Sequence, residues 1–222
     1  MSEVNNPLNI LVLVSGSGSN LQALIDAQAQ GEFESTGFSA YTSAAGKNAA
    51  RISAVISSHE GVYAIERAKA AQIPFFVEKP DMNLPKPERR IELSDRILAH
   101  CRKMHIGLVV YAGFLSILSG DIIQEYAGKM INIHPALLPK FGGHGMYGIH
   151  VHKAVLAANE SESGCTVHLV DAGTDTGKIL LQRKVPVLAD DTPESLAKRI
   201  LIEEHIAIVD GVKMMIGQLG GS

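Results

Sequence analysis

Short apolar runs alternate with amphipathic stretches through the first half of the chain. We expect buried strands at the runs 9–14, 51–57, 74–77 and 108–111. We expect helices in the stretches between them, at residues 21–28, 61–71 and 88–102. Strands that alternate with helices in this way predict parallel βαβ units, as in Rossmann-like folds.

The second half breaks this pattern. We expect strands at residues 129–133, 164–170 and 179–185 and helices at residues 148–158 and 192–216. The last two strands alternate apolar and polar residues, which is typical of a half-exposed hairpin and would make the sheet mixed. Thr192 is the expected N-cap of a long C-terminal helix, with Pro193 in its first turn. We therefore predict a single α/β domain.

Composition narrows the possible classes of function. The chain has 222 residues, which fits one domain, and its net charge of −3 favours neither nucleic acid nor a membrane surface as a partner. Cys101 and Cys165 form no CxxC pair, which argues against a disulfide framework or a structural zinc site and fits a reducing compartment. Because the sequence shows neither a signal-peptide pattern nor an apolar stretch of the roughly 20 residues that span a bilayer, we expect a cytoplasmic protein.

Residues 15–20, Ser-Gly-Ser-Gly-Ser-Asn, separate the first expected strand from the first expected helix, whose N-cap we expect at Ser19 or Asn20. Backbone N–H groups at such a helix start can surround an anion. The third glycine of the dinucleotide fingerprint is Leu21 here, and no Walker Gly-Lys-Ser/Thr follows. A monophosphate is therefore a better ligand than a nucleotide, and the alternative is a tight turn that binds nothing.

Asn132 and His134 stand two residues apart at the end of an expected strand, so their side chains face the same side. Pro135 favours an extended His134, and open α/β sheets bind ligands at the carboxyl ends of their strands. An amide donor beside an imidazole suits acyl chemistry, since one can polarise a carbonyl while the other moves a proton. The alternative is a hydrogen-bonded histidine at a strand edge.

A loop rich in acids and glycines follows at residues 170–178. Within it, Asp175 could orient His134 or raise its proton affinity. The alternative is that Asp171 and Asp175 only cap backbone groups of a turn. The spacing supports neither a Ser-His-Asp nor a Cys-His nucleophile, so direct acyl transfer without a covalent intermediate is the simpler hypothesis.

The chain resembles the folate-dependent phosphoribosylglycinamide formyltransferases from about residue 9 to about residue 213. The resemblance is carried by a phosphate loop at 14–22, a folate-pocket segment at 112–119, the Asn-x-His-Pro segment of the wider superfamily at 132–139, and a catalytic-aspartate loop at 167–177 followed by Gln182. It implies one domain over residues 1–222, with a phosphate-binding half at 9–111 and a folate-binding and catalytic half at 112–222.

The resemblance implies transfer of a formyl group from the co-substrate 10-formyltetrahydrofolate to the amine of N1-(5-phospho-D-ribosyl)glycinamide, in de novo purine (IMP) biosynthesis. It implies small-molecule substrates and no metal, and it is compatible with a homodimer. By position, Asn132 would donate to the formyl oxygen, and His134 would donate a proton or stabilise the oxyanion. Asp175 would hold His134 and a water, and His168 would support the region of the aspartate.

The resemblance also assigns binding residues. The substrate phosphate would meet Gly18, Ser19 and Asn20, and Glu204 would contact the ribose or the glycinamide part. The folate would lie against Leu115, Ser116, Ile117 and Leu118 and against the backbone of Val170, Asp171, Ala172 and Gly173.

The chain departs from the family pattern near these motifs. An arginine common in the folate segment is Ser116 here, so one substrate contact is missing or supplied elsewhere. The basic residue that would meet the phosphate aligns with Arg90 or, next, with Arg89. A longer loop over residues 142–150 begins with Gly-Gly where the family has Pro-Gly, and the connection at residues 31–48 is also longer than usual.

Three other functions stay open. A formyl-folate hydrolase and a methionyl-tRNA formyltransferase share the Asn-x-His-Pro segment, but we expect each to need an additional domain. His144, His150 and His152 with Asp171 or Cys165 could be drawn as metal ligands, although two of these histidines would diverge on a helix. The third alternative is a non-catalytic module that binds a phosphorylated ligand on the same fold.

Overall fold

The structure is a computed structural model of the chain and describes residues 7–34 and 49–219. Within these ranges the strands are β1 (Leu8–Val14), β2 (Ala50–Ser57), β3 (Phe75–Val77), β4 (Ile106–Tyr111), β5 (Met130–His134), β6 (Glu162–Leu169) and β7 (Ile179–Pro186). The helices in the same ranges are α1 (Ser19–Ala29), α2 (Tyr63–Ala70), α3 (Lys86–Lys103), α4 (Asp121–Glu125), α5 (Ile149–Ala157) and α6 (Pro193–Leu219).

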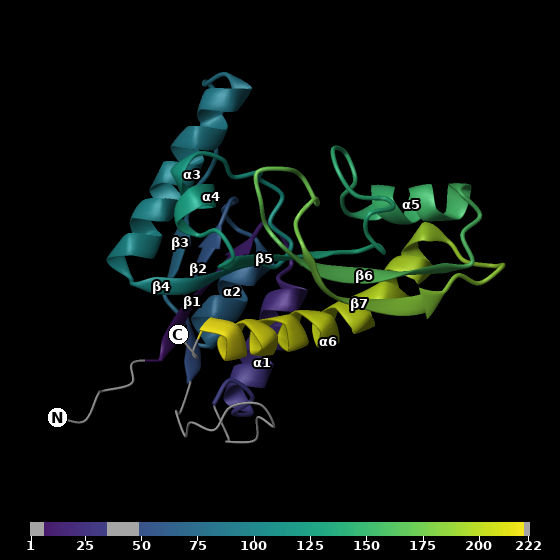
Figure 1. Cartoon of the computed structure of the whole chain (residues 1–222), viewed down its shortest axis with the longest axis horizontal. Helices are drawn as coiled ribbons and strands as arrows, with labels where there is room; N and C mark the ends of the chain where they lie inside the picture. The colour runs from purple at the N-terminus through teal and green to yellow at the C-terminus, as the bar shows by residue number, and fades with distance from the viewer. Residues whose placement is uncertain (1–6, 35–48, 220–222) are drawn as a thin grey trace.

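The strands form one sheet in the order β3-β2-β1-β4-β5-β6-β7 (Figure 1). The first five in this order pair in parallel, whereas β6 is antiparallel to both of its neighbours. This confirms the predicted α/β domain with a mixed sheet and a long C-terminal helix. From β1 the chain first adds β2 on one side and later β4 on the other. The strand order therefore reverses between β1 and β4, and open α/β sheets bind ligands beyond the strand ends at such a point.

Strand β1 shows why the first apolar run is continuous. Ile10, Val12 and Val14 belong to one core cluster, which includes residues of α1 and α6. Leu11 and Leu13 belong to the other cluster, which includes residues of α3 and α4. Each of these five side chains is at most 1% exposed. Because side chains of a strand alternate between its faces, a strand covered by helices on both faces needs apolar residues throughout.

The helix starts differ from expectation in one case and agree in another. The N-cap of α1 is Gly18, in the left-handed conformation with φ 71°, so the expectation of Ser19 or Asn20 is wrong. Glycine takes this conformation without a Cβ penalty, and the two polar residues lie inside the helix. At α6, Ser195 N–H donates to Thr192 Oγ1 over 3.2 Å, which confirms the predicted cap.

Other differences concern short or uncertain segments. Helix α4 has five residues, too few to show a helical period in the sequence, and it was not predicted. Most of the expected connection at residues 31–48 lies outside the described residues. Strand β5 begins at Met130 and includes His134, so the imidazole belongs to the last residue of the strand.

The close packing of α6 on β6 can be tested. An added Cβ at Gly211 would lie 2.7 Å from Cγ1 of Val167, whereas one at Gly217 would have no atom within 4 Å. We expect Gly211→Val to lower the free energy of unfolding by about 1–3 kcal/mol through overpacking. The matched control Gly217→Val should leave it nearly unchanged. Urea denaturation followed by circular dichroism measures both, and equal stabilities would contradict the packing described here.

Candidate active site

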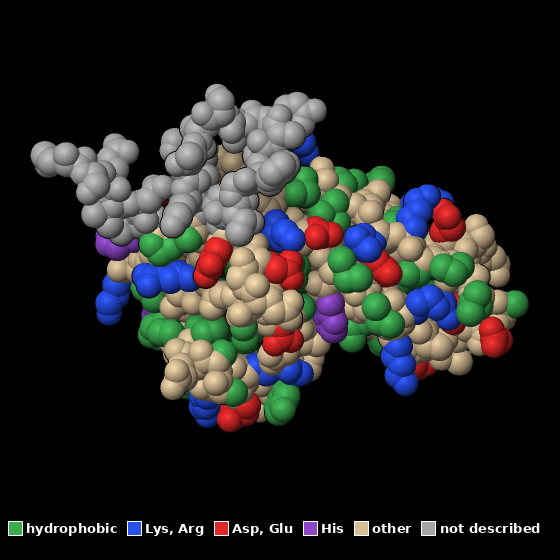
Figure 2. Space-filling model, turned by 90° about the horizontal axis from the view of Figure 1, so that it is seen from below, with side chains coloured by type: hydrophobic (Ala, Val, Ile, Leu, Met, Phe, Trp, Pro, Cys, Tyr) green, Lys and Arg blue, Asp and Glu red, His purple; other side chains and the backbone are tan. Residues whose placement is uncertain are grey.

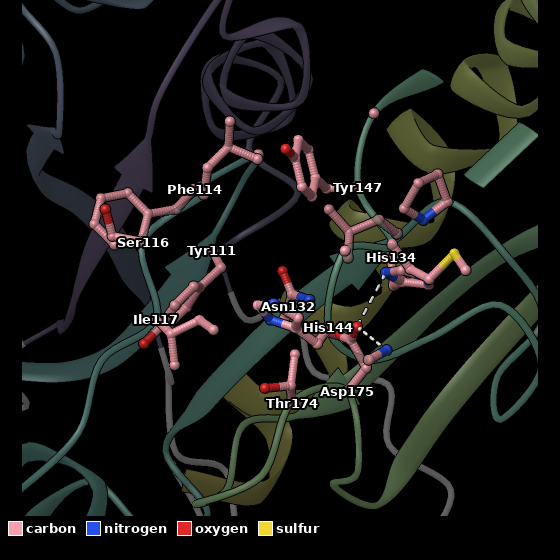
Figure 3. Close-up of a pocket in the computed structure, with 18 of the residues that line it drawn as sticks. Tyr111, Phe114, Ser116, Ile117, Asn132, His134, His144, Tyr147, Thr174 and Asp175 are labelled. Carbon is pink, nitrogen blue, oxygen red and sulfur yellow. Dashed lines mark hydrogen bonds and ion pairs between the residues drawn. The ribbon is translucent and has the colours of Figure 1, made fainter. Parts of the chain in front are cut away.

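A cavity of about 960 Å³ opens at the carboxyl edge of the sheet, and Figure 3 shows part of its lining. The predicted site residues that line it are Asn20, Arg90, Leu115, Ser116, Ile117, Leu118, Asn132, His134, His168, Val170, Asp171, Gly173, Asp175 and Glu204. Gly18, Ser19 and Ala172 are not among its lining residues, and Ala172 borders a smaller hollow instead. One cavity thus joins the start of α1, the end of β5 and a face of α6.

Strand register brings the central residues together. Asn132 of β5 stands opposite Tyr111 of β4 on one side and opposite His168 of β6 on the other. His134 follows at the end of β5, and Asp175 comes from the loop between β6 and β7. Figure 3 shows Asn132, His134 and Asp175 gathered at the cavity wall, where the interaction between the last two is dashed.

The imidazole of His134 is held through both ring nitrogens. Its Nε2–H donates to the backbone carbonyl of Phe141 over 2.7 Å, and its Nδ1 lies 3.6 Å from Oδ2 of Asp175. Since a carbonyl can only accept, the proton of the neutral ring sits on Nε2 and the free lone pair on Nδ1. Burial lowers the pKa of His134, and the negative charge of Asp175 opposes this without cancelling it.

Asp175 lies between two histidines. Its Oδ1 is 3.6 Å from Nε2 of His168, and its Oδ2 accepts the N–H of Gly143 over 2.9 Å. Burial raises the pKa of this carboxyl, but His168, the Gly143 N–H and the charge of His134 outweigh burial, so the pKa lies below its ordinary value. The carboxylate is therefore ionised at neutral pH, and it lies beside His134, the imidazole that it could orient.

The glycines that open the longer loop serve this arrangement. A Cβ on Gly142 would lie 3.2 Å from Cβ of Asp175 and 2.5 Å from Cδ2 of Leu138. Gly143, with φ 90°, supplies the N–H that Asp175 accepts. The Gly-Gly pair is thus the segment against which the aspartate packs.

His168 orients the side-chain amide of Asn132. Its Nδ1–H donates to the carbonyl of Leu169 over 2.8 Å, so its Nε2 carries the lone pair. Nε2 accepts an N–H from Nδ2 of Asn132 over 3.1 Å. The amide nitrogen of Asn132 is therefore fixed, and its second N–H is left for a ligand in the cavity. The sequence suggested a supporting role for His168 but not this contact.

At the start of α1, the two ends of the Asn20 side-chain amide have different surroundings. Nδ2 of Asn20 donates to Oε2 of Glu204 over 2.8 Å, whereas Oδ1 of Asn20 is buried without a partner in the described structure. The side-chain donor of Asn20 is therefore already used, and what it offers the cavity is an acceptor. Burial raises the pKa of Glu204, and the hydrogen bond from Asn20 opposes this.

The opposite part of the cavity is mainly apolar. Phe114 and Tyr111 pack edge to face with ring centroids 5.7 Å apart, and Leu115 is 59% exposed. The N–H of Leu115 donates to Oγ of Ser15 over 2.9 Å, which ties this segment to the glycine loop. Asp171 accepts from Gly173 N–H and from the Thr176 hydroxyl, so the capping alternative holds for this aspartate.

One end of the cavity is basic. Lys86, Arg89 and Arg90 of α3 line it beside Met82. Arg89 donates to the carbonyl of Leu84 over 3.0 Å, whereas the side chain of Arg90 has no hydrogen bond or ion pair within the described residues. Neither Met82 nor Lys86 stands in a recognisable motif, so neither could be selected from the sequence.

Two further residues of the cavity wall lie on α6 at helical spacing from Glu204, and a third comes from the longer loop. Lys198 and Leu201 line the cavity from α6; Leu201 stands three residues before Glu204, and Lys198 three residues before Leu201, so each is a helical neighbour of the next. Tyr147, from the longer loop, is 52% exposed and also lines the cavity. No motif pointed to this tyrosine.

The metal alternative gains no support from the arrangement of the histidines. His152 is buried in the cavity wall, whereas His144 and His150 are exposed. Within residues 7–34 and 49–219, no three His, Cys, Asp or Glu side chains converge as metal ligands would. Cys101 and Cys165 are buried, and burial raises the pKa of each thiol to about 12.

The charges on one face of the molecule are mixed. On the face seen in Figure 2, Lys and Arg side chains alternate with Asp and Glu side chains, so this face has no extended basic area. No helix in the described part of the chain is long and apolar enough to cross a membrane.

Known proteins resemble this chain over most of its length. A family model described as formyl transferase matches residues 8–212. The chain is 36% identical over 199 residues to the phosphoribosylglycinamide formyltransferase of Escherichia coli, which covers 89% of this chain and 82% of that one. The crystal structure of glycinamide ribonucleotide transformylase 1 from Symbiobacterium toebii superimposes with a TM-score of 0.80 at 31% identity, over 96% of this chain and 89% of that one.

A longer relative contains a similar segment. The trifunctional purine biosynthetic protein adenosine-3 of Drosophila pseudoobscura pseudoobscura is 42% identical over 201 residues, which are 89% of this chain. This chain spans 13% of that protein.

The charge coupling of Asp175 and His134 can be measured. In the free protein, we expect the imidazole of His134 to titrate below 6.5, because burial disfavours its cation. Asp175→Asn removes an attractive negative charge, so the pKa of His134 should fall further. The matched control Asp171→Asn, in the same loop, should leave it unchanged. Imidazole NMR signals followed against pH give these values, and an unchanged or higher pKa in Asp175→Asn would contradict the coupling.

Proposed function

The chain belongs to the formyl transferase family, and we propose that it transfers a formyl group from 10-formyltetrahydrofolate to the amine of N1-(5-phospho-D-ribosyl)glycinamide. The products would be formylglycinamide ribonucleotide and tetrahydrofolate, in purine biosynthesis. The observation that carries the proposal is the cluster of Asn132, His134 and Asp175 in the wall of one cavity, between the glycine loop and an apolar segment.

The amine of the ribonucleotide attacks the formyl carbon and forms a tetrahedral oxyanion. The free N–H of Asn132 is fixed by His168 and donates to that oxygen. His134, once protonated, carries its positive charge beside the oxyanion while Nε2–H stays on Phe141. Its Nδ1 faces Asp175, whose negative charge favours the imidazolium. A water beside Asp175 can take the proton that the attacking amine loses and pass it to the folate nitrogen, so that the formyl carbon keeps its new bond to the amine as its bond to the folate breaks.

The ribonucleotide binds at the start of α1. Within the described residues, the backbone N–H groups of residues 17–21 have no acceptor, so those of Ser19 and Asn20, with Gly18, can meet the phosphate. The buried Oδ1 of Asn20 and the carboxyl of Glu204 are acceptors and suit ribose hydroxyls or the glycinamide nitrogens. The side chain of Asn20 thus binds a neutral part of the substrate, and only its backbone meets the phosphate.

The folate binds along the apolar part of the cavity. Leu115, Ile117 and Leu118 would hold the pteridine on one side, and the backbone of residues 170–173 would hold it on the other. Arg90 has no ion pair within the described structure and supplies a cation for an anionic group of either substrate. Ser116 lines the cavity without a charge, so the basic end of α3 replaces the missing arginine.

We assign residues 9–111 to phosphate binding and residues 112–222 to folate binding and catalysis. Both substrates are small molecules, and we place the protein in the cytoplasm. A homodimer stays a prediction.

A formyl-folate hydrolase is the alternative function with the same catalytic residues. The free backbone N–H groups at the start of α1 favour the transferase, because they can bind the phosphate of the ribonucleotide.

An assay with formyl-folate, with and without the ribonucleotide, tests the proposal. We expect turnover only when both substrates are present. His134→Ala should lower kcat by about 10²–10³-fold, because it removes a stabiliser of the oxyanion. The exposed His150 offers a matched control, His150→Ala, which should keep near-normal kcat. Deformylation without the ribonucleotide would instead identify a hydrolase.

The hydrogen bond between His168 and Asn132 predicts a second effect. His168→Phe removes the acceptor and frees the amide to rotate, so we expect kcat to fall by about 10²-fold through misplacement of the donor. His168→Gln restores an acceptor and should recover part of the loss. The pH profile of kcat should keep its midpoint in both variants if His168 acts only through Asn132. Full activity of His168→Phe would exclude this role.

A further inference from the structure

The outer side of the glycine loop packs on helix α2, which the proposed function does not use. Ala64 N–H donates to the carbonyl of Gly16 over 3.2 Å. Nε of Arg67 donates to the carbonyl of Ser17 over 2.9 Å. A Cβ on Gly18 would lie 2.7 Å from Cβ of Ala64 and 3.4 Å from Cδ of Arg67. Two successive carbonyls of the loop are therefore bound from the side of α2.

This binding fixes the direction of the loop N–H groups. In a planar trans peptide the N–H points opposite to the C=O. With the carbonyls of Gly16 and Ser17 turned toward α2, the N–H groups of Ser17 and Gly18 point away from it. Neither N–H donates to any residue that the structure describes. The loop is thus preset with free donors on the side opposite α2.

Arg67 itself carries a charge without a carboxylate partner. Nη1 donates to Oε1 of Gln22 over 2.9 Å, and the guanidinium lies 4.8 Å from the ring centroid of Tyr63. These contacts and the Ser17 carbonyl are all neutral, and Arg67 has no ion pair within the described part of the chain. Its half-buried guanidinium therefore leaves net positive charge directly behind the free N–H groups.

We propose that Arg67 is a positioning residue for recognition of the substrate phosphate. Its hydrogen bond to the Ser17 carbonyl holds that peptide in the orientation that exposes the N–H donors of the loop, and its hydrogen bond to Gln22 connects it to α1. Its positive charge stabilises the phosphate dianion from the opposite side of the loop. The inference rests on the proposed function, because the phosphate is that of the proposed ribonucleotide. Arg67 touches the loop and does not take part in formyl transfer.

The test compares the phosphorylated substrate with its dephosphorylated riboside. In Arg67→Gln, KM for the ribonucleotide should rise on the order of tenfold to a hundredfold, as for loss of a charge-assisted contact. KM for the riboside and KM for formyl-folate should stay within about threefold, since neither needs the phosphate contact. The preference for the phosphorylated substrate should therefore shrink.

Two further variants serve as controls. Arg67→Lys keeps the charge but cannot bridge two acceptors with a planar fork, so its KM should lie between those of the parent and Arg67→Gln. Arg102→Gln removes an arginine that pairs with Glu125 outside the cavity, and it should leave every KM unchanged. An unchanged ribonucleotide KM in Arg67→Gln would overturn the proposal, as would an equal rise for the riboside.

Binding without turnover separates this proposal from the proposed function. If the parent protein transfers no formyl group, the function fails, and inorganic phosphate then serves as the probe. We expect phosphate to raise the melting temperature of the parent protein and of Arg102→Gln, but to raise that of Arg67→Gln much less. An equal rise in all three proteins, or no rise in the parent, would contradict the role of Arg67.

Discussion

The chemistry of this site depends on one carboxylate that is largely shielded from solvent, that of Asp175, held 3.6 Å from the rings of both His134 and His168. A charge in this place is costly unless it is hydrogen-bonded and paired. The N–H of Gly143 donates to the carboxylate, and His134 can pair with it once its ring is protonated. The backbone is shaped accordingly, because Asp175 adopts φ 57° and Gly142 leaves room for its Cβ.

The two histidines beside this carboxylate act differently because their other nitrogens bind different carbonyls. His134 gives its Nε2–H to Phe141, so Nδ1 is the nitrogen turned to the carboxylate. His168 gives its Nδ1–H to Leu169, so Nε2 remains an acceptor for Asn132. One ring can therefore gain a proton on the nitrogen that faces the carboxylate, while the other uses its Nε2 to order an amide. Backbone carbonyls, rather than the choice of side chain, assign these two roles.

The sequence predicted the parts of the molecule that depend on local pattern. Continuous apolar runs predicted the parallel strands, and the alternation of apolar and polar residues predicted the hairpin of β6 and β7. The two-residue spacing of Asn132 and His134 placed both at the end of β5. What it did not give depends on pairings between distant segments. The contact of Asn132 with His168 follows from the register of β5 on β6, and that of Asn20 with Glu204 joins residues 184 positions apart. The N-cap of α1 was also missed, because the left-handed turn is set by packing of Gly18 on α2.

The hydrogen bond between Asn20 and Glu204 joins α1 to α6. The acceptor end of the cavity therefore exists only after α6 has packed against α1, although the glycine loop itself is encoded in the first twenty residues. During synthesis, a nascent chain can form the parallel strands and their loops while the part of the cavity that contains Glu204 is still missing. The ribosome must therefore release Glu204 from its exit tunnel before this part of the binding site can form, so the complete site appears later than the glycine loop that belongs to it.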